Sequence, residues 1–121
     1  MNRIIPIIPL LACIIVPSAC SSGSTPADNC EAAAPASCPA EAPSYATDVA
    51  PLLQTYCSGC HAPGGEEEEL PLTSYDAVRT LAGGVQSQVG SCSMPPGEED
   101  QPSTEERDRI LAWIVCGADN N

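Results

Sequence analysis

Apolar side chains in the middle of the chain recur at the spacing of one helix face. Four of them stand at positions i, i+3, i+4 and i+7: Val49, Leu52, Leu53 and Tyr56. This period predicts a helix that runs directly into Cys57. Thr47 or Asp48 can cap the start of this helix, and Pro51 is tolerated within its first turn.

The segment from residue 74 to residue 102 predicts short helices followed by a loop. Ser74 is placed to begin a helical stretch, which the pair Gly83-Gly84 is expected to end. Val85 and Val89 predict a further turn of helix. Residues 90–102 are rich in Gly, Pro and acidic residues, which is typical of a loop.

The last predicted helix has the clearest boundaries. Ser103 and Glu106 have the spacing of a capping box, and Gly117 is a typical C-terminal stop. The residues between them form a broad apolar face: Ile110, Leu111, Trp113, Ile114 and Val115. Because no strand-like alternation and no internal repeat occur, we expect one all-α domain over residues 44–121.

The N-terminal residues have the layout of an export signal. Residues 1–16 carry one charge, at Arg3, and then an apolar run that is too short to span a bilayer comfortably. We therefore expect residues 1–19 to be a lipoprotein-type signal peptide and Cys20 to be the lipid-modified first residue of the mature chain. Cys13 follows a better leucine-containing motif, but cleavage there would leave a very short signal. A plain secretory signal and an uncleaved anchor are the alternatives.

The segment after the signal is rich in Ser, Ala and Pro. Residues 20–43 are therefore expected to form a flexible tether rather than a packed element. A signal peptide and a lipid anchor together predict a bacterial envelope location, facing the periplasm or the exterior.

Charge and composition narrow the possible partners and the core. The chain has 16 acidic and 4 basic residues, a net charge of −12, so we expect no nucleic-acid partner, because phosphate contacts need basic groups. One Trp, three Tyr and no Phe make a thin core for a domain of this size. A large flat apolar cofactor would fill such a core, and disulfides could also stabilise it.

The chemistry is concentrated in the run Cys57-Ser58-Gly59-Cys60-His61. Cys-x-x-Cys-His is the pattern of covalent attachment of c-type haem, in which two thiols add to the two vinyl groups of the porphyrin. The imidazole of His61 would then bind the iron. The chain contains one histidine, and it directly follows the second cysteine.

Two other sites use a similar pattern. A thioredoxin-like redox pair would need a βαβ context, which the sequence does not predict. A zinc site would need four ligands, and Cys92 could join Cys57, Cys60 and His61. Structural zinc usually draws on two separated pairs of ligands, and no second pair occurs.

Met94 is the candidate for the second axial ligand of the iron. It is the one methionine left after signal removal, and it lies in the loop Met94-Pro95-Pro96. A His/Met pair raises the reduction potential relative to harder ligands. The alternative is that Met94 is an apolar loop residue without a ligand role.

Three segments together resemble class I cytochrome c, and in particular the small single-haem domains of bacterial envelope proteins. They are the helix from Asp48 into the motif 57–61, the Met94-Pro95-Pro96 loop and the helix 110–114 before Gly117. The resemblance implies three to four helices around one haem c bound through Cys57 and Cys60, with His61 and Met94 as axial ligands. It also implies that the first and last helices cross, with Trp113 at their contact. The short separation of His61 and Met94 predicts a trimmed middle.

Four further cysteines are expected to form disulfides in an oxidising compartment: Cys30, Cys38, Cys92 and Cys116. They allow three pairings. We favour Cys30–Cys38 and Cys92–Cys116, because the other pairings would tie the tether to the domain.

Together these features predict a monomeric, lipid-anchored electron-transfer protein with no enzymatic activity. Its partners would be redox proteins, and a basic docking face would match its acidic charge. The alternatives are a haem-based ligand-binding or sensing domain in which Met94 is displaceable or absent from the iron, and a disulfide-rich interaction protein of unrelated fold.

Overall fold

The computed structural model describes residue 30 and residues 32–121. The expected signal peptide, the lipidation site at Cys20 and the first part of the tether lie outside the described residues.

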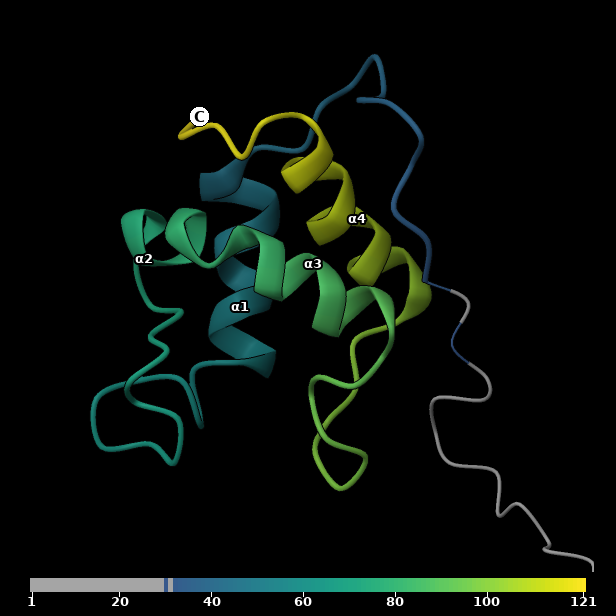
Figure 1. The fold of residues 1–121 in the computed structure, drawn as a ribbon. Helices are drawn as coiled ribbons and strands as arrows, with labels where there is room; N and C mark the ends of the chain where they lie inside the picture. Colours follow the sequence, from purple (N-terminus) through teal and green to yellow (C-terminus); the bar gives the residue numbers. More distant parts are fainter. Residues whose placement is uncertain (1–29, 31) are drawn as a thin grey trace, which may run out of the picture.

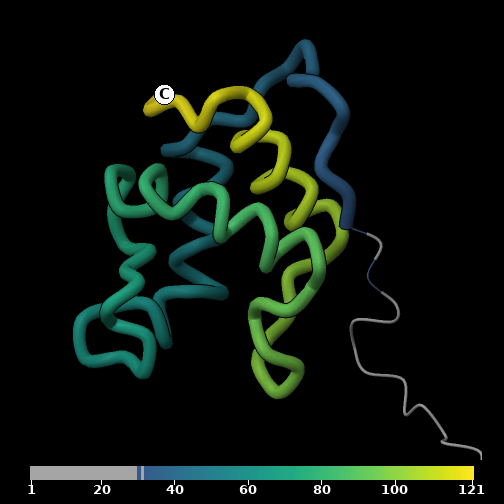
Figure 2. The backbone as a smooth tube through the Cα atoms, in the orientation of Figure 1, coloured from purple at the N-terminus to yellow at the C-terminus, as the bar shows by residue number. Residues whose placement is uncertain are grey.

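Helices make up the regular structure of the described residues. A π-helical segment, η2 (Tyr45–Val49), continues into α1 (Ala50–Tyr56), and α2 (Tyr75–Thr80), α3 (Ala82–Gly90) and α4 (Thr104–Val115) follow. No strand occurs in residues 32–121, so the expected all-α class is confirmed. In Figures 1 and 2, α3 crosses in front of the cluster. The two long loops, before α2 and before α4, both extend from its lower end, the first on the left and the second further to the right.

The first helical run begins earlier than the sequence predicts. Its cap is Ser44, whose side chain accepts from the Thr47 N–H, so the expectation of a cap at Thr47 or Asp48 was wrong. Asp48 instead accepts from the Ser44 N–H at 2.8 Å. Together the two bonds satisfy the N–H groups of Ser44 and Thr47 at the start of the helix. Pro51 lies in the first turn of α1, as expected.

The pair Gly83-Gly84 does not end a helix. Ser74 caps α2 as expected, but α2 ends at Thr80, with Leu81 as its C-cap. Both glycines lie in the first turn of α3. Neither glycine adopts a positive φ, so neither supplies the left-handed backbone that stops a helix.

The helix α4 follows its prediction closely. Ser103 and Glu106 form the reciprocal capping box, and Gly117 has a φ of 102° just after the helix. Trp113 is 1% exposed, and its ring centroid lies 5.4 Å from that of Tyr45. Its Nε1–H donates to the Asp119 carbonyl at 2.9 Å. The start of the first helical run therefore packs on α4 through this aromatic pair.

The disulfide pairing differs from the one that the sequence favoured. The bonds are Cys30–Cys92 and Cys38–Cys116, so the expected pairs Cys30–Cys38 and Cys92–Cys116 were wrong. The pairing follows from the tertiary structure. The arm formed by residues 32–43 runs alongside α4 in Figure 1, and the Ala33 N–H donates to the Asp108 side chain of that helix at 2.9 Å. The described part of the expected tether is thus joined to the domain at two places: at Cys92, just after α3, and at Cys116, the C-cap of α4.

None of the helices in the described part of the chain is long and apolar enough to cross a membrane.

Candidate functional site

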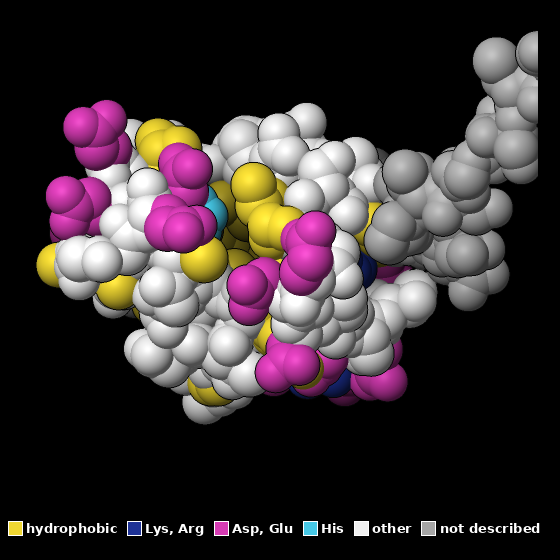
Figure 3. Space-filling model, turned by 90° about the horizontal axis from the view of Figure 1, so that it is seen from below, with side chains coloured by type: hydrophobic (Ala, Val, Ile, Leu, Met, Phe, Trp, Pro, Cys, Tyr) yellow, Lys and Arg dark blue, Asp and Glu magenta, His cyan; other side chains and the backbone are white. Residues whose placement is uncertain are grey.

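A cavity of about 540 Å³ opens at the lower end of the helix cluster. Its walls come from the end of α1, the loop that follows, α3 and the loop from Met94 to Asp100. Viewed from below in Figure 3, it is a hollow with a hydrophobic interior and the edge of the histidine. The volume lies within the range of roughly 300–1,000 Å³ that small-molecule and cofactor sites occupy.

Cys57 and Cys60 reach the cavity because α1 ends at the motif. The Cys57 N–H still donates to Leu53 at 2.9 Å, and the chain then turns so that the His61 N–H donates to the Cys57 carbonyl at 2.9 Å. This turn brings both thiols and the imidazole to one wall. Both cysteines are free and half-buried, and burial raises the pKa of the Cys57 thiol to about 11. The thiol therefore stays protonated at neutral pH.

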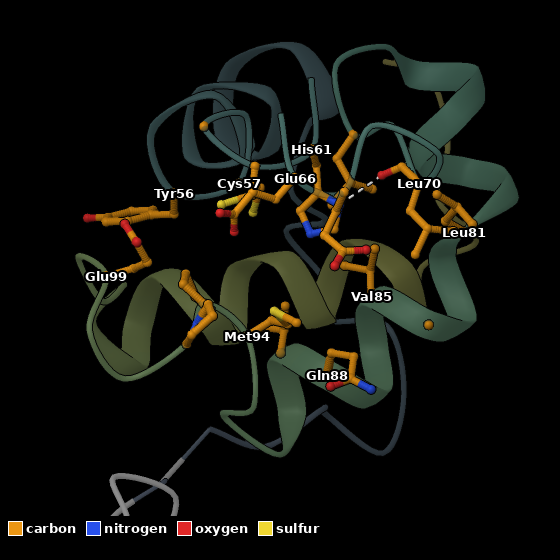
Figure 4. Close-up of a pocket in the computed structure, with 18 of the residues that line it drawn as sticks. Tyr56, Cys57, His61, Glu66, Leu70, Leu81, Val85, Gln88, Met94 and Glu99 are labelled. Carbon is orange, nitrogen blue, oxygen red and sulfur yellow. Dashed lines mark hydrogen bonds between the residues drawn. The ribbon is translucent and has the colours of Figure 1, made fainter. Parts of the chain in front are cut away.

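His61 has a fixed orientation. Its Nδ1 lies 2.9 Å from the Leu70 carbonyl oxygen, shown as a dashed line in Figure 4. A carbonyl can only accept, so Nδ1 carries the proton of the neutral ring and Nε2 keeps a lone pair. A backbone carbonyl on one ring nitrogen is the usual support for a histidine whose other nitrogen binds a metal.

Met94 lines the same cavity, on the side across from His61 in Figure 4. It follows α3, and two hydrogen bonds fix its main chain. The Met94 N–H donates to the Gln88 carbonyl at 3.2 Å, and the Met94 carbonyl accepts from the Arg107 side chain at 2.7 Å. The four residues expected to bind haem, Cys57, Cys60, His61 and Met94, thus line one cavity.

The remaining wall suits a flat apolar group. Aliphatic side chains cover much of it: Leu70, Leu72, Leu81, Val85 and Val89. Gly59 and Gly84 also line it, and a Cβ placed on either would meet no atom within 4 Å. The two glycines therefore leave room that a side chain would occupy.

Acidic residues surround the mouth of the cavity. Glu66 and Glu67 lie on one side, and Glu99 and Asp100 lie on the other. Figure 3 shows acidic side chains at the rim of the hollow. The four consecutive glutamates from Glu66 to Glu69 are exposed.

The structure does not favour the two alternative interpretations of the motif, a zinc site and a thioredoxin-like redox pair. Cys92 is bonded to Cys30, so it cannot complete a zinc site with Cys57, Cys60 and His61. In the described part of the chain, no group of three His, Cys, Asp or Glu residues is arranged to hold a metal ion. A thioredoxin-like pair lacks its sheet, since residues 32–121 contain no strand.

Sequence reasoning missed the support of the Met94 loop. Arg107 is buried in α4 and donates to the Met94 carbonyl and to the Gln101 side chain. The Nε2 atom of Gln101 in turn lies within hydrogen-bond distance of three carbonyls of the loop. One signal for Arg107 was available, because it precedes Ile110 and Leu111 by three and four residues and so shares their buried face.

No family model, no curated protein and no solved structure matches this chain.

Proposed function

We propose that this protein is a single-haem c-type cytochrome that carries electrons one at a time at the bacterial cell envelope. One observation carries the proposal: two free thiols, an imidazole with an available Nε2 and a thioether all line a cavity of about 540 Å³. Two hydrogen bonds of the protein support the arrangement: the Nδ1 atom of His61 lies 2.9 Å from the Leu70 carbonyl oxygen, and the Met94 carbonyl accepts from Arg107 at 2.7 Å.

The residues present fit haem c in chemistry as well as in number. Cys57 and Cys60 would each add S–H across a vinyl double bond, with sulfur bonding one carbon and hydrogen the other, so the attachment itself needs no oxidant. Nε2 of His61 and the sulfur of Met94 would take the two axial positions. When bound, the haem iron supplies a one-electron couple.

Electron transfer is favoured over catalysis by the ligand set. A soft thioether and an imidazole would both serve as ligands to the iron, whereas catalysis at haem needs a position that no protein ligand takes. The aliphatic wall would limit the access of water to a bound haem, which also favours a stable ligand pair. We therefore assign no enzymatic activity to the chain.

The setting of the protein is part of the proposal. Residues 1–19 would direct export, and a lipid on Cys20 would hold the monomeric domain at a membrane facing the periplasm or the exterior. The acidic rim around the cavity favours a redox partner with a basic face, because opposite charges speed encounter.

Haem staining of the full chain on a denaturing gel tests covalent attachment. The chain is expressed in a bacterial host with haem-attachment machinery, and we expect a stained band that the Cys57→Ala, Cys60→Ala double variant lacks. The matched control is the Cys30→Ser, Cys92→Ser double variant, which removes two cysteines outside the motif and should keep the stain. An unstained wild-type chain, or a stained Cys57→Ala, Cys60→Ala variant, overturns the proposal.

A further inference from the structure

Arg107 is an unusual residue in this fold. It is 4% exposed. In the part of the chain that the structure describes, it is the one charged residue that is buried. The ion pair recorded among these residues joins Arg109 to Glu105, so no described carboxylate neutralises Arg107. Burial lowers the pKa of its guanidinium, which reports the cost of taking this charge out of water.

The hydrogen bonds of Arg107 are all directed at the loop that carries Met94 and at the end of α3. Nη1 donates to the Met94 carbonyl at 2.7 Å and to the Val89 carbonyl at 3.3 Å. Nη2 donates to Oε1 of Gln101 at 2.6 Å. The planar fork of a guanidinium can hold these three acceptors in one fixed arrangement.

Gln101 extends this network along the loop. Its Nε2 lies within hydrogen-bond distance of three carbonyls: those of Pro95 at 3.3 Å, Pro96 at 2.7 Å and Glu99 at 3.0 Å. Arg107 and Gln101 together therefore contact the backbone from Met94 to Glu99, which forms one wall of the cavity.

A purely structural role for Arg107 accounts for only part of this arrangement. A cation near the last turn of α3 would favour the Val89 contact through the helix dipole. It does not account for the shorter bond to Met94 or for the relay through Gln101. Of the two backbone carbonyls that Arg107 contacts, the nearer belongs to Met94, whose side chain faces His61 across the cavity.

We infer that Arg107 is a positioning residue for Met94: through its bond to the Met94 carbonyl and through Gln101, it holds the loop so that the thioether stays at the cavity. The inference rests on the proposed function, because the role of the thioether there is to bind haem iron. We therefore expect substitution of Arg107 to weaken the binding of Met94 to the iron more than it lowers the stability of the fold.

The test compares Arg107→Gln, Arg107→Lys and Gln101→Ala with the wild-type holoprotein. The readouts are the far-red sulfur-to-iron band of the oxidised protein, the rate at which added imidazole replaces the thioether, and the reduction potential. We expect Arg107→Gln to lose most of the band and to bind imidazole about tenfold faster, since a charged hydrogen bond is lost. Arg107→Lys keeps the charge without the fork and should restore little of the band.

Removal of the buried cation also predicts a lower reduction potential. The oxidised iron carries one more positive charge than the reduced iron, so a nearby cation disfavours the oxidised form. Gln101→Ala keeps Arg107 and should give a smaller change in the same direction for the band and for imidazole binding. If Arg107→Gln fails to fold, Gln101→Ala tests the same inference.

Two controls separate positioning from general destabilisation. Arg109→Gln removes a partly exposed arginine of the same helix and should change neither the band nor the imidazole rate. Val78→Ala weakens the buried core in α2, away from the loop, and should lower the unfolding temperature while leaving the band intact.

The outcomes distinguish the inference from the proposed function. A wild-type protein without covalent haem, or without the far-red band, refutes the His61/Met94 assignment and the inference with it. A wild-type protein with the band, whose Arg107→Gln and Gln101→Ala variants keep the band and the imidazole rate of the Arg109→Gln control, refutes the inference alone.

Discussion

The imidazole Nδ1 of His61 lies 2.9 Å from the carbonyl oxygen of Leu70, nine residues later in the chain. The bond spans the loop after the Cys57-to-His61 turn and fixes which ring nitrogen carries the proton. We predict that the reduced holoprotein has a protonated Nδ1 and a non-protonated Nε2. Nitrogen NMR of protein labelled at histidine measures this directly, because the chain contains one histidine. A proton on Nε2 would be inconsistent with iron binding through that atom.

The disulfide pairing gives a second prediction. Cys30–Cys92 and Cys38–Cys116 close segments of 62 and 78 residues, so each should stabilise the fold by roughly 4 kcal/mol through restriction of the unfolded chain. We expect both serine double variants to lose stability to a similar extent in denaturant unfolding of the holoprotein. Peptide mapping without reduction should recover these two pairs; recovery of Cys30–Cys38 would contradict the structure.

The two disulfides should differ in their effect on the site. Cys92 lies two residues before Met94, whereas Cys116 lies at the end of α4. The Cys30→Ser, Cys92→Ser variant should therefore weaken the far-red band more than the Cys38→Ser, Cys116→Ser variant at the same temperature. Equal effects would show that the link to residue 92 does not stabilise the ligand loop.

Glu106 should make the stability depend on pH in the acid range. Its pKa is lowered from the usual value of 4.5, first by the Ser103 N–H at 2.8 Å, with a further contribution from the Tyr56 hydroxyl at 3.1 Å. A lowered pKa in the folded state means that the carboxylate stabilises the fold above 4.5 and that this contribution is lost as the pH falls further, through the folded pKa.

The matched pair for this prediction is Glu106→Gln against Glu105→Gln. The unfolding temperature of Glu106→Gln should lie below that of the wild type at pH 7, and the gap should shrink below pH 4.5. Glu105 is exposed and forms a surface ion pair with Arg109, so its variant should stay close to the wild type throughout. A gap for Glu106→Gln that does not change with pH would contradict the assigned role.

The acidic rim predicts salt-dependent electron transfer to a basic partner. Glu66→Gln with Glu67→Gln removes two charges at the mouth of the cavity, and Glu41→Gln with Glu105→Gln removes two charges elsewhere. In stopped-flow measurements at low salt, the first pair should slow the reaction with a basic redox protein more than the second. The difference should disappear at high salt, where surface charges are screened. Equal rates at low salt would refute a docking role for this rim.

The sequence predicts the residues of the site better than it predicts what supports them. Local patterns sufficed for the capping box at Ser103 and Glu106, because both partners lie within one helical turn. The motif Cys57 to His61 likewise depends on a single turn at the end of α1. Met94 could be chosen by composition alone, as the one methionine outside the expected signal peptide.

The errors concern contacts between distant parts of the chain. Cys30 and Cys38 lie close in sequence, but the arm runs along α4 and carries them to different partners. Arg107 looks like a surface charge until α4 is packed against the end of α3 and the Met94 loop. Gly83-Gly84 appeared to be a stop because glycine disfavours helices, yet packing of Val85 and Val89 into the core retains the helix through them.

The most direct test of the proposed function is the optical spectrum of the purified exported protein in its oxidised and reduced forms. The account predicts a covalent haem spectrum with a far-red sulfur-to-iron band in the oxidised form. The band should disappear on reduction and in Met94→Ala, and reduced wild-type protein should bind carbon monoxide slowly. A haem spectrum without that band and with rapid carbon monoxide binding would favour a ligand-binding or sensing protein, and the absence of any haem spectrum would contradict the account.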